Sequence, residues 1–340
     1  MSPARNPFRS IVVPVDGSPI AEQAIPVALE IARRAGSTVR LVLVHRELSP
    51  LLIMEPAEVY TKTVLAFHKY ESDYLRGLAE RVEQELGRPI TTAALKGPVL
   101  STLTDYIADI GADLVIMTTH GRGGIRRAWL GSVTDHLIRT SKVPVLCVRA
   151  MEGGVSLDQV RAPEILVPLD GSPLAEAVLE PVVALAKLWD AEVSLVRVVQ
   201  PVLLSTDPVL PLPTGYDEQL TEAERDGAND YLRDITGRLR ERGVTATGLA
   251  VLGHGPAETI LDLAGSRRVG LVALATHGRG GVRRLALGSV ADKLVRGAEV
   301  PVLVVRPAAP RRPKKKATEE LGMKNPSTQD DRTAKALVLY

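Results

Sequence analysis

The sequence predicts an α/β protein built from two similar halves, each a doubly wound, five-stranded parallel sheet of Rossmann-like type. Short apolar runs alternate with amphipathic segments along most of the chain, and this alternation forces parallel strand pairing with helical crossovers. The order of runs and segments then repeats, because the apolar run at 11–15 returns at 165–169. A glycine-rich stretch, Thr-His-Gly-Arg-Gly-Gly, also occurs twice, at 119–124 and at 276–281.

The repeat sets the expected domain boundaries. We expect a first domain at 8–150 and a second at 163–306, joined by a polar segment that contains Gly153 and Gly154. A period of this length indicates a duplicated domain, since solenoid repeats recur about every 20 to 50 residues. The remaining stretch, 307–340, lacks helical or strand periodicity, and we expect a basic, disordered tail.

Charge and composition indicate a globular protein and bear on whether it binds nucleic acid. The chain is 45% hydrophobic and 24% charged, which is typical of a globular protein, and 340 residues suit two domains. The tail holds eight Lys or Arg and four Asp or Glu, which leaves 34 basic and 36 acidic groups elsewhere. A nearly neutral folded part gives no case for nucleic-acid binding. The basic cluster at 311–316 could contact nucleic acid or acidic lipid, but we favour a solvated tail.

The cysteine content and the apolar runs bear on location. The single cysteine, Cys147, lies within Val-Pro-Val-Leu-Cys-Val and is expected to be a buried small hydrophobe. One cysteine cannot form a disulfide within the chain, which agrees with a reducing compartment. No apolar run is long enough to span a membrane, and the N-terminus lacks the hydrophobic region of a signal peptide. We therefore expect a cytoplasmic protein without a membrane span.

The first domain is expected to open with a buried strand at 11–15 that ends in Asp16-Gly17-Ser18. Because open α/β sheets bind ligands at the carboxyl ends of their strands, Asp16 is a candidate polar contact. A helix is expected over 19–35, where the apolar spacing is helical and Gly36 ends the pattern. The further elements are a strand at 38–45, a Pro-containing loop at 46–56, a helix to about 86, a strand at 90–95, a helix at 100–110, a strand at 113–117, a helix at 134–140 and a strand at 143–148.

The second domain repeats this order. Its opening strand at 165–169 ends in Asp170-Gly171-Ser172, so that Asp170 corresponds to Asp16. The further elements are a strand at 193–199, a Pro-rich loop at 201–213, a strand at 244–251, a helix at 259–264, a strand at 271–274, a helix at 291–297 and a strand at 300–305.

Both glycine-rich stretches lie between a predicted strand and a predicted helix. Glycines allow the backbone to approach a ligand closely, and the unpaired N–H groups of a helix start favour an anion. Ser132 and Ser289 each follow a glycine and could act as helix N-cap or as hydroxyl donor to phosphate. An ordinary strand-to-helix turn is the alternative, but two copies with nearly the same spacing favour phosphate binding.

On these residues the chain resembles the universal stress protein family. ATP-binding members carry a glycine, any two residues, a glycine, any nine residues, and a glycine followed by Ser or Thr after the fourth strand. The second and third glycines and the hydroxyl residue match Gly121, Gly131 and Ser132, and again Gly278, Gly288 and Ser289. The first glycine is replaced by Thr118 and by Ala275.

The resemblance implies ATP, with Mg²⁺ neutralising the phosphates, in each domain of a stress regulator or sensor. It also implies the strand order 3-2-1-4-5, and pairing of the two domains through their fifth strands, with a homodimer or another protein partner as further assembly. The implied contacts of the first domain are Asp16, Arg46, Met117, Thr118, Gly121, Gly131, Ser132 and Val133. Those of the second are Asp170, Val198, Leu274, Ala275, Gly278, Gly288, Ser289 and Val290.

The sequence offers little for catalysis, and we assign no catalytic or metal-binding residue. His120 and His277 recur within the glycine-rich stretches, but a general base needs a positioned nucleophile and an orienting partner. Neither stretch has the Gly-Lys-Ser ending of a P-loop, no nucleophile elbow is present, and no His or Cys cluster has metal-ligand spacing. Arg122 and Arg279 are the nearest repeated cations.

Two alternatives to a nucleotide-dependent regulator stay open. One is an enzyme, a slow ATP hydrolase or phosphotransferase. The other is an interaction protein whose nucleotide sites are vestigial. The arginine pairs at 126–127 and 283–284 could reach phosphate or a partner surface, and a solvated helix face explains them equally well.

Overall fold

The computed structural model describes residues 8–45, 57–119, 130–151, 153–154, 163–205, 213–266, 268–276 and 287–307. All of these belong to one compact unit. Within these ranges, no helix has the length and apolar character needed to cross a membrane.

The first half alternates strands with helices as the sequence predicts. Its elements are β1 (Ser10–Val15), α1 (Pro19–Glu22), α2 (Ile25–Ala35), β2 (Thr38–His45), α3 (Ala57–Leu86), β3 (Thr91–Lys96), α4 (Val99–Asp109), β4 (Leu114–Thr118), α5 (Ser132–Thr140) and β5 (Val145–Val148).

The second half repeats the series with one insertion between its second strand and the long helix that follows. Its elements are β6 (Glu164–Pro168), the 3₁₀ helix η2 (Ala175–Val178), α7 (Leu179–Trp189), β7 (Glu192–Val199), β8 (Leu203–Ser205), β9 (Pro213–Tyr216), α8 (Glu218–Glu241), β10 (Ala246–Leu252), α9 (Pro256–Ser266), β11 (Val269–Ala275), α10 (Ser289–Gly297) and β12 (Val302–Val305).

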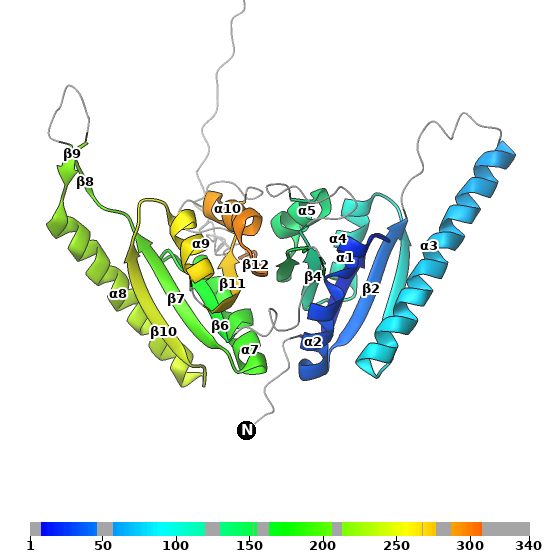
Figure 1. Ribbon diagram of the computed structural model, residues 1–340, viewed down its shortest axis with the longest axis horizontal. Coiled ribbons are helices and arrows are strands. Elements are labelled where there is room, and N and C mark those ends of the chain that lie inside the picture. Colours follow the sequence, from blue (N-terminus) through cyan, green and yellow to red (C-terminus); the bar gives the residue numbers. More distant parts are fainter. Residues whose placement is uncertain are drawn as a thin grey trace, which may run out of the picture. The chain divides into compact units, whose positions relative to one another are not determined.

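The strands form one ten-stranded sheet in the order β10-β7-β6-β11-β12-β5-β4-β1-β2-β3 (Figure 1). Each half has the expected order 3-2-1-4-5, with neighbouring strands parallel. The halves join where β5 and β12 pair antiparallel, with Leu146 opposite Leu303. The expected pairing of the two fifth strands is therefore confirmed.

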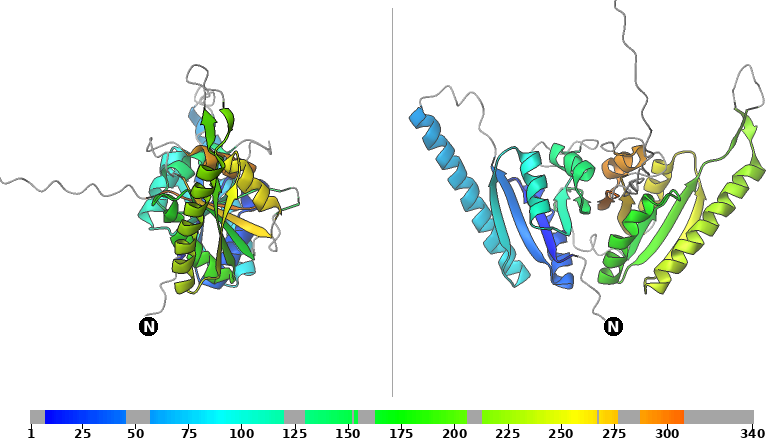
Figure 2. Two further views of the ribbon diagram at one scale, coloured as in Figure 1. Left: turned by 90° about the vertical axis from the view of Figure 1, so that its left-hand side faces the viewer. Right: turned by 180° about the vertical axis from the view of Figure 1, so that it is seen from behind.

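Helices cover both faces of this sheet, as a doubly wound fold requires (Figure 2). Because side chains alternate along a strand, β1 sends Ile11 and Val13 into one core cluster and Val12 into the other. The first cluster packs under α2, α3, α7 and α8, and the second under α4, α5, α9 and α10. Both clusters contain residues of both halves, so the halves share their cores.

Two expected elements differ in the structure. The helix expected over 19–35 is broken into α1 and α2 at Gln23 and Ala24. Pro26 lies in the first turn of α2 and has no N–H to donate to the carbonyl of Glu22, so the helix must restart there. The loop expected at 201–213 contains β8, which pairs antiparallel with β9.

Candidate functional site

The predicted site residues that the structure describes lie where the strand order reverses. From β1 the chain proceeds outward to β2 and β3, and it then returns to build β4 and β5 on the other side of β1. The carboxyl ends of β1 and β4 therefore flank a topological switch point, and those of β6 and β11 flank a second one. Open α/β sheets bind ligands in the crevice at such points.

A carboxylate is held at the end of β1 by its own turn. Asp16 Oδ1 accepts hydrogen bonds from Ser18 N at 3.0 Å and Ser18 Oγ at 2.6 Å, and Ser18 Oγ accepts from Ala21 N at 3.2 Å. Gly17 between them has φ +80°, a left-handed conformation that favours glycine. The turn thus fixes the carboxylate and caps α1 at once.

The end of β6 carries the same turn. Asp170 Oδ1 accepts from Ser172 N at 2.9 Å, and Ser172 Oγ accepts from Ala175 N at 3.2 Å. Gly171 has φ +83°. The correspondence of Asp170 with Asp16, expected from sequence, is therefore also geometric.

A helix begins at the other side of each switch point, and a glycine is its N-cap. Gly131 N donates to Thr119 O at 2.8 Å, and Gly288 N donates to Thr276 O at 3.0 Å. A Cβ added to Gly288 would lie 3.0 Å from the Thr276 oxygen, so a side chain would crowd this strand-to-helix contact.

The expectation that Ser132 and Ser289 could serve as N-caps is wrong, because each is the first helical residue. An N-cap needs the extended backbone that the preceding glycines adopt, with ψ of 144° and 149°. In the described part, neither glycine-capped start has a side-chain cap. Among the described residues, no side chain caps the first N–H groups of α5 and α10, which is the arrangement that suits an anion.

The strand-four residues are buried beside these starts. Met117 and its counterpart Leu274 are 6% and 4% exposed and pack into the second core cluster. Thr118 is also buried, and its carbonyl accepts from Thr134 Oγ1 at 2.9 Å. The second half has no such bond, because Ala291 stands at the position of Thr134. The two candidate sites are therefore similar but not identical.

The strand-two contacts of the two halves do not correspond as expected. Counting from the proline that both opening strands contain, the strand registers make Val198 equivalent to Val44, not to Arg46. Val44 and Val198 are both half-buried and pack against the second core cluster. The contacts implied by the family resemblance did not include Val44, although counting from the shared proline would have located it. Arg46 lies outside the described residues.

Several predicted residues of the glycine-rich stretches also lie outside the described residues. They are His120, Gly121, Arg122, His277, Gly278, Arg279 and the arginine pairs at 126–127 and 283–284. Their proposed roles stay predictions. Val133 and Val290 lie in the first turns of α5 and α10, next to Ser132 and Ser289. These are positions where the family resemblance implies phosphate contacts.

A buried polar cluster near the first site was not foreseen. His45, at the end of β2, contacts the Glu71 carboxylate of α3 through Nδ1, and the two side chains are 7% and 3% exposed. The ring of His68 lies 4.3 Å from that of His45. Desolvation, followed by the nearby His45 and Lys96, lowers the pKa of His68. Among the described residues, no group of three or more His, Cys, Asp or Glu side chains is arranged to hold a metal ion.

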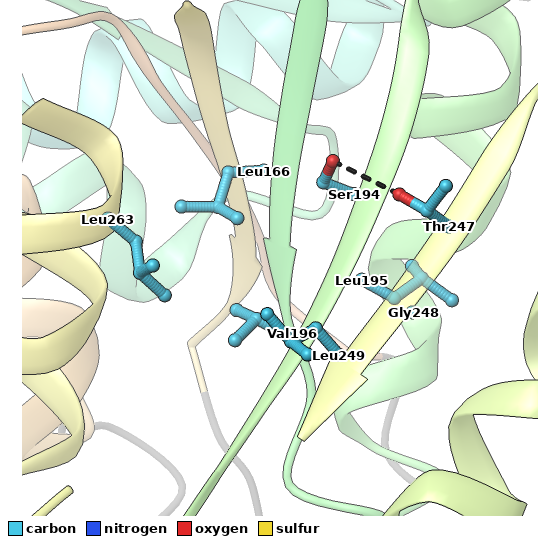
Figure 3. A pocket seen from close by; sticks show the side chains of 8 residues that line it. All are labelled: Leu166, Ser194, Leu195, Val196, Thr247, Gly248, Leu249 and Leu263. Atoms are coloured by element: carbon cyan, nitrogen blue, oxygen red, sulfur yellow. Dashed lines mark hydrogen bonds between the residues drawn. The ribbon is translucent and has the colours of Figure 1, made fainter. Parts of the chain in front are cut away.

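A cavity of about 160 Å³ lies away from both switch points (Figure 3). It lies over β6, β7 and β10 beside α9, and Ser194 Oγ and Thr247 Oγ1 meet there at 3.4 Å. In the first half, the larger Arg40 and Tyr106 stand at the positions of Ser194 and Leu263, which explains the extra space. We do not assign this cavity to nucleotide binding. Its lining residues are Leu166, Ser194, Leu195, Val196, Thr247, Gly248, Leu249 and Leu263.

Comparison with known proteins gives concordant matches. The model of the Universal stress protein family matches residues 7–149 and again 163–306. A universal stress protein of Mycolicibacterium smegmatis is 27% identical over 306 residues, covering 87% of this chain and 97% of that protein. One of Mycobacterium tuberculosis is 30% identical over 210 residues, covering 61% and 67%. The crystal structure of one from Archaeoglobus fulgidus has a TM-score of 0.61 at 18% identity, covering 88% and 96%.

Proposed function

The chain belongs to the universal stress protein family, and we propose that it binds ATP in each of two domains, 8–150 and 163–306, as a nucleotide-dependent regulator or sensor of stress. A cytoplasmic location is part of this proposal. The sheet order and the tandem arrangement support a proposal of one site in each half.

One observation carries the proposal: both switch points combine a carboxylate fixed by its turn with a helix start capped by glycine. Asp16 and the start of α5 flank the first, and Asp170 and the start of α10 flank the second. A carboxylate suits the hydroxyl groups of a ribose, and open N–H groups at a helix start suit phosphate. A nucleotide offers both groups at once, because its ribose hydroxyls can meet the carboxylate while its phosphates meet the helix start.

Further described residues suit the base, whereas we assign none of them to the metal. Val44 with Met117, and Val198 with Leu274, give each site apolar side chains beside which an adenine could pack. Mg²⁺ generally reaches such sites with the phosphates and keeps several waters. We therefore propose that Mg²⁺ enters with ATP rather than through a dedicated set of protein ligands.

Calorimetric titration of the full chain with ATP and Mg²⁺ tests the proposal, and we expect close to two ATP bound per chain. Ser132→Glu and Ser289→Glu each place a negative charge at a helix start, where it favours the helix but repels phosphate. Each should weaken its own site at least about tenfold, or about 1.4 kcal/mol. Ser101→Glu, in the first turn of α4 at an exposed position, is the matched control and should leave both sites unchanged.

The same sample separates the alternatives. A regulator releases ATP unchanged or hydrolyses it slowly, whereas an enzyme turns it over repeatedly at rates commonly near 10 per second. An interaction protein with vestigial sites gives no heat of binding in either domain. The absence of binding at both sites would refute the proposed function.

A further inference from the structure

Two arginines cross the boundary between the halves in the same way. Arg149, directly after β5, donates from Nη1 to the carbonyl of Ala298 at 3.0 Å, and Ala298 is the C-cap of α10. Arg306, directly after β12, donates from Nη1 to the carbonyl of Thr140 at 3.0 Å, and Thr140 is the last residue of α5. Each half thus supplies a cation to the end of the other half's helix, where cations are favoured.

The residues just before these arginines are tied to the starts of the same two helices. Thr119 donates from N to Val148 O at 2.9 Å and accepts from Gly131 N at 2.8 Å. In the second half, Thr276 donates from N to Val305 O at 2.8 Å and accepts from Gly288 N at 3.0 Å. Thr119 and Thr276 are 6% and 1% exposed, so these links are buried.

Together these bonds close a ring through both candidate sites. From the start of α5 it passes through Thr119 and β5 to Arg149, and from there to the end of α10. It then follows α10 to its start, and returns through Thr276, β12 and Arg306 to the end of α5. We call this the arginine ring. The two helices are also close enough to interact electrostatically. The hydrogen bond to Asp135 raises the pKa of Arg139 in α5, and the charge of Asp292 in α10 raises it further.

We propose that the arginine ring couples the two helix starts, so that occupancy of one site changes the affinity of the other. The inference rests on the proposed function in that the ligand is a nucleotide. A nine-residue helix is a rigid rod about 14 Å long, so a shift of its start by bound phosphate moves its end as well. Close-packed elements pass such shifts on rather than absorb them, and the resulting coupling acts equally in both directions.

Amide hydrogen exchange of the nucleotide-free chain tests the ring itself. Arg149→Met should speed exchange about fivefold at the amide of Asp292, in the first turn of α10, and Arg306→Met should do the same at Asp135 in α5. A merely local role would change only the last-turn amides, Ala298 and Ser141. Arg149→Lys and Arg306→Lys keep a cation within reach and should restore most of the protection.

Arg34→Met is the matched control. Arg34 Nη1 also crosses between the halves, to Leu188 O at 3.1 Å, but it lies between α2 and α7 and outside the ring. It also pairs with the buried Glu30, so its loss costs stability without touching either helix start. Unchanged exchange at Asp292 and Asp135 in both ring variants, or an equal change in the control, would overturn the coupling.

A second arm uses ATP as the probe. In Ser289→Glu, an ATP concentration that fills the first site but leaves the weakened second site largely empty should change exchange at Asp292 about fivefold. The change should vanish when Arg149→Met and Arg306→Met are added. Bound ATP without any change at Asp292 in the intact ring would overturn the proposal. Absence of ATP binding would refute the proposed function instead, while the nucleotide-free arm still decides whether the ring couples the helix starts.

Discussion

Replacing Glu71 by alanine should destabilise the protein strongly, although the side chain lies outside both candidate sites. Glu71 is 3% exposed and pairs with His45, which is 7% exposed. Removing one partner of a buried ion pair costs about 3–5 kcal/mol, and an unsatisfied buried polar group about 1–3 kcal/mol. The two ranges meet at about 3 kcal/mol, which we expect for Glu71→Ala, or a shift of about 1 M in the urea midpoint at an m-value of about 3 kcal/mol per M.

The second half supplies the apolar version of this pair. Counting along the equivalent elements, Val199 and Ala228 stand at the positions of His45 and Glu71, and both are buried. The double variant His45→Val with Glu71→Ala introduces the residues of the second half. Replacing a buried pair by apolar side chains often changes the free energy of unfolding little. It should therefore cost at least about 2 kcal/mol less than the sum of the single variants.

Urea unfolding followed by circular dichroism measures all three variants. Glu80→Ala, at an exposed position on the same helix, is the control and should stay within about 0.5 kcal/mol of the unchanged protein. A cost below about 1 kcal/mol for Glu71→Ala, or simple additivity in the double variant, would show that the pair does not hold β2 against α3.

The structure makes two further predictions. The pKa of His68 is lowered in the folded protein, so the unfolded chain binds a proton more readily at this position. The free energy of unfolding should therefore be highest above about pH 6.5, the usual pKa of histidine, and fall as the pH drops below that value. His68→Asn should flatten this part of a pH–stability profile, and an unchanged slope would contradict the prediction. Burial raises the pKa of the Cys147 thiol to about 12, so a thiol reagent at pH 8 should label it only after unfolding, and rapid labelling of the native protein would be inconsistent with this environment.

Much of the fold was accessible from sequence because burial leaves a pattern. The mostly apolar segment at 38–45 was predicted as a strand and is β2 with the same bounds. The break between α1 and α2 was missed although Pro26 marks it. The β8–β9 pair was missed because short strands in a Pro-rich stretch carry no periodic signal.

The site was accessible only in part, because its contacts depend on tertiary structure. Asp16 and Asp170 could be located from the strand ends, and the repeat located Gly131 and Gly288. That glycine rather than serine caps each helix follows from the carbonyl contact at Thr119 or Thr276, which no local pattern encodes. The same is true of His45 and Glu71, which meet only because α3 packs on β2.

The antiparallel seam between β5 and β12 has a consequence for self-association. It occupies both fifth-strand edges within one chain, so the outer strands of the sheet are β3 and β10. At β10 two backbone groups already have side-chain partners: Asn229 accepts from Ala250 N at 3.3 Å, and Arg240 donates to Ala246 O at 2.8 Å. An edge shielded in this way offers little template to another strand, and the β3 edge ends in the charged Lys96. Because both halves belong to one chain, the fifth strands pair inside the sheet and are not exposed edges. Addition of further strands, and hence growth into fibres, is disfavoured at the two outer strands, β3 and β10.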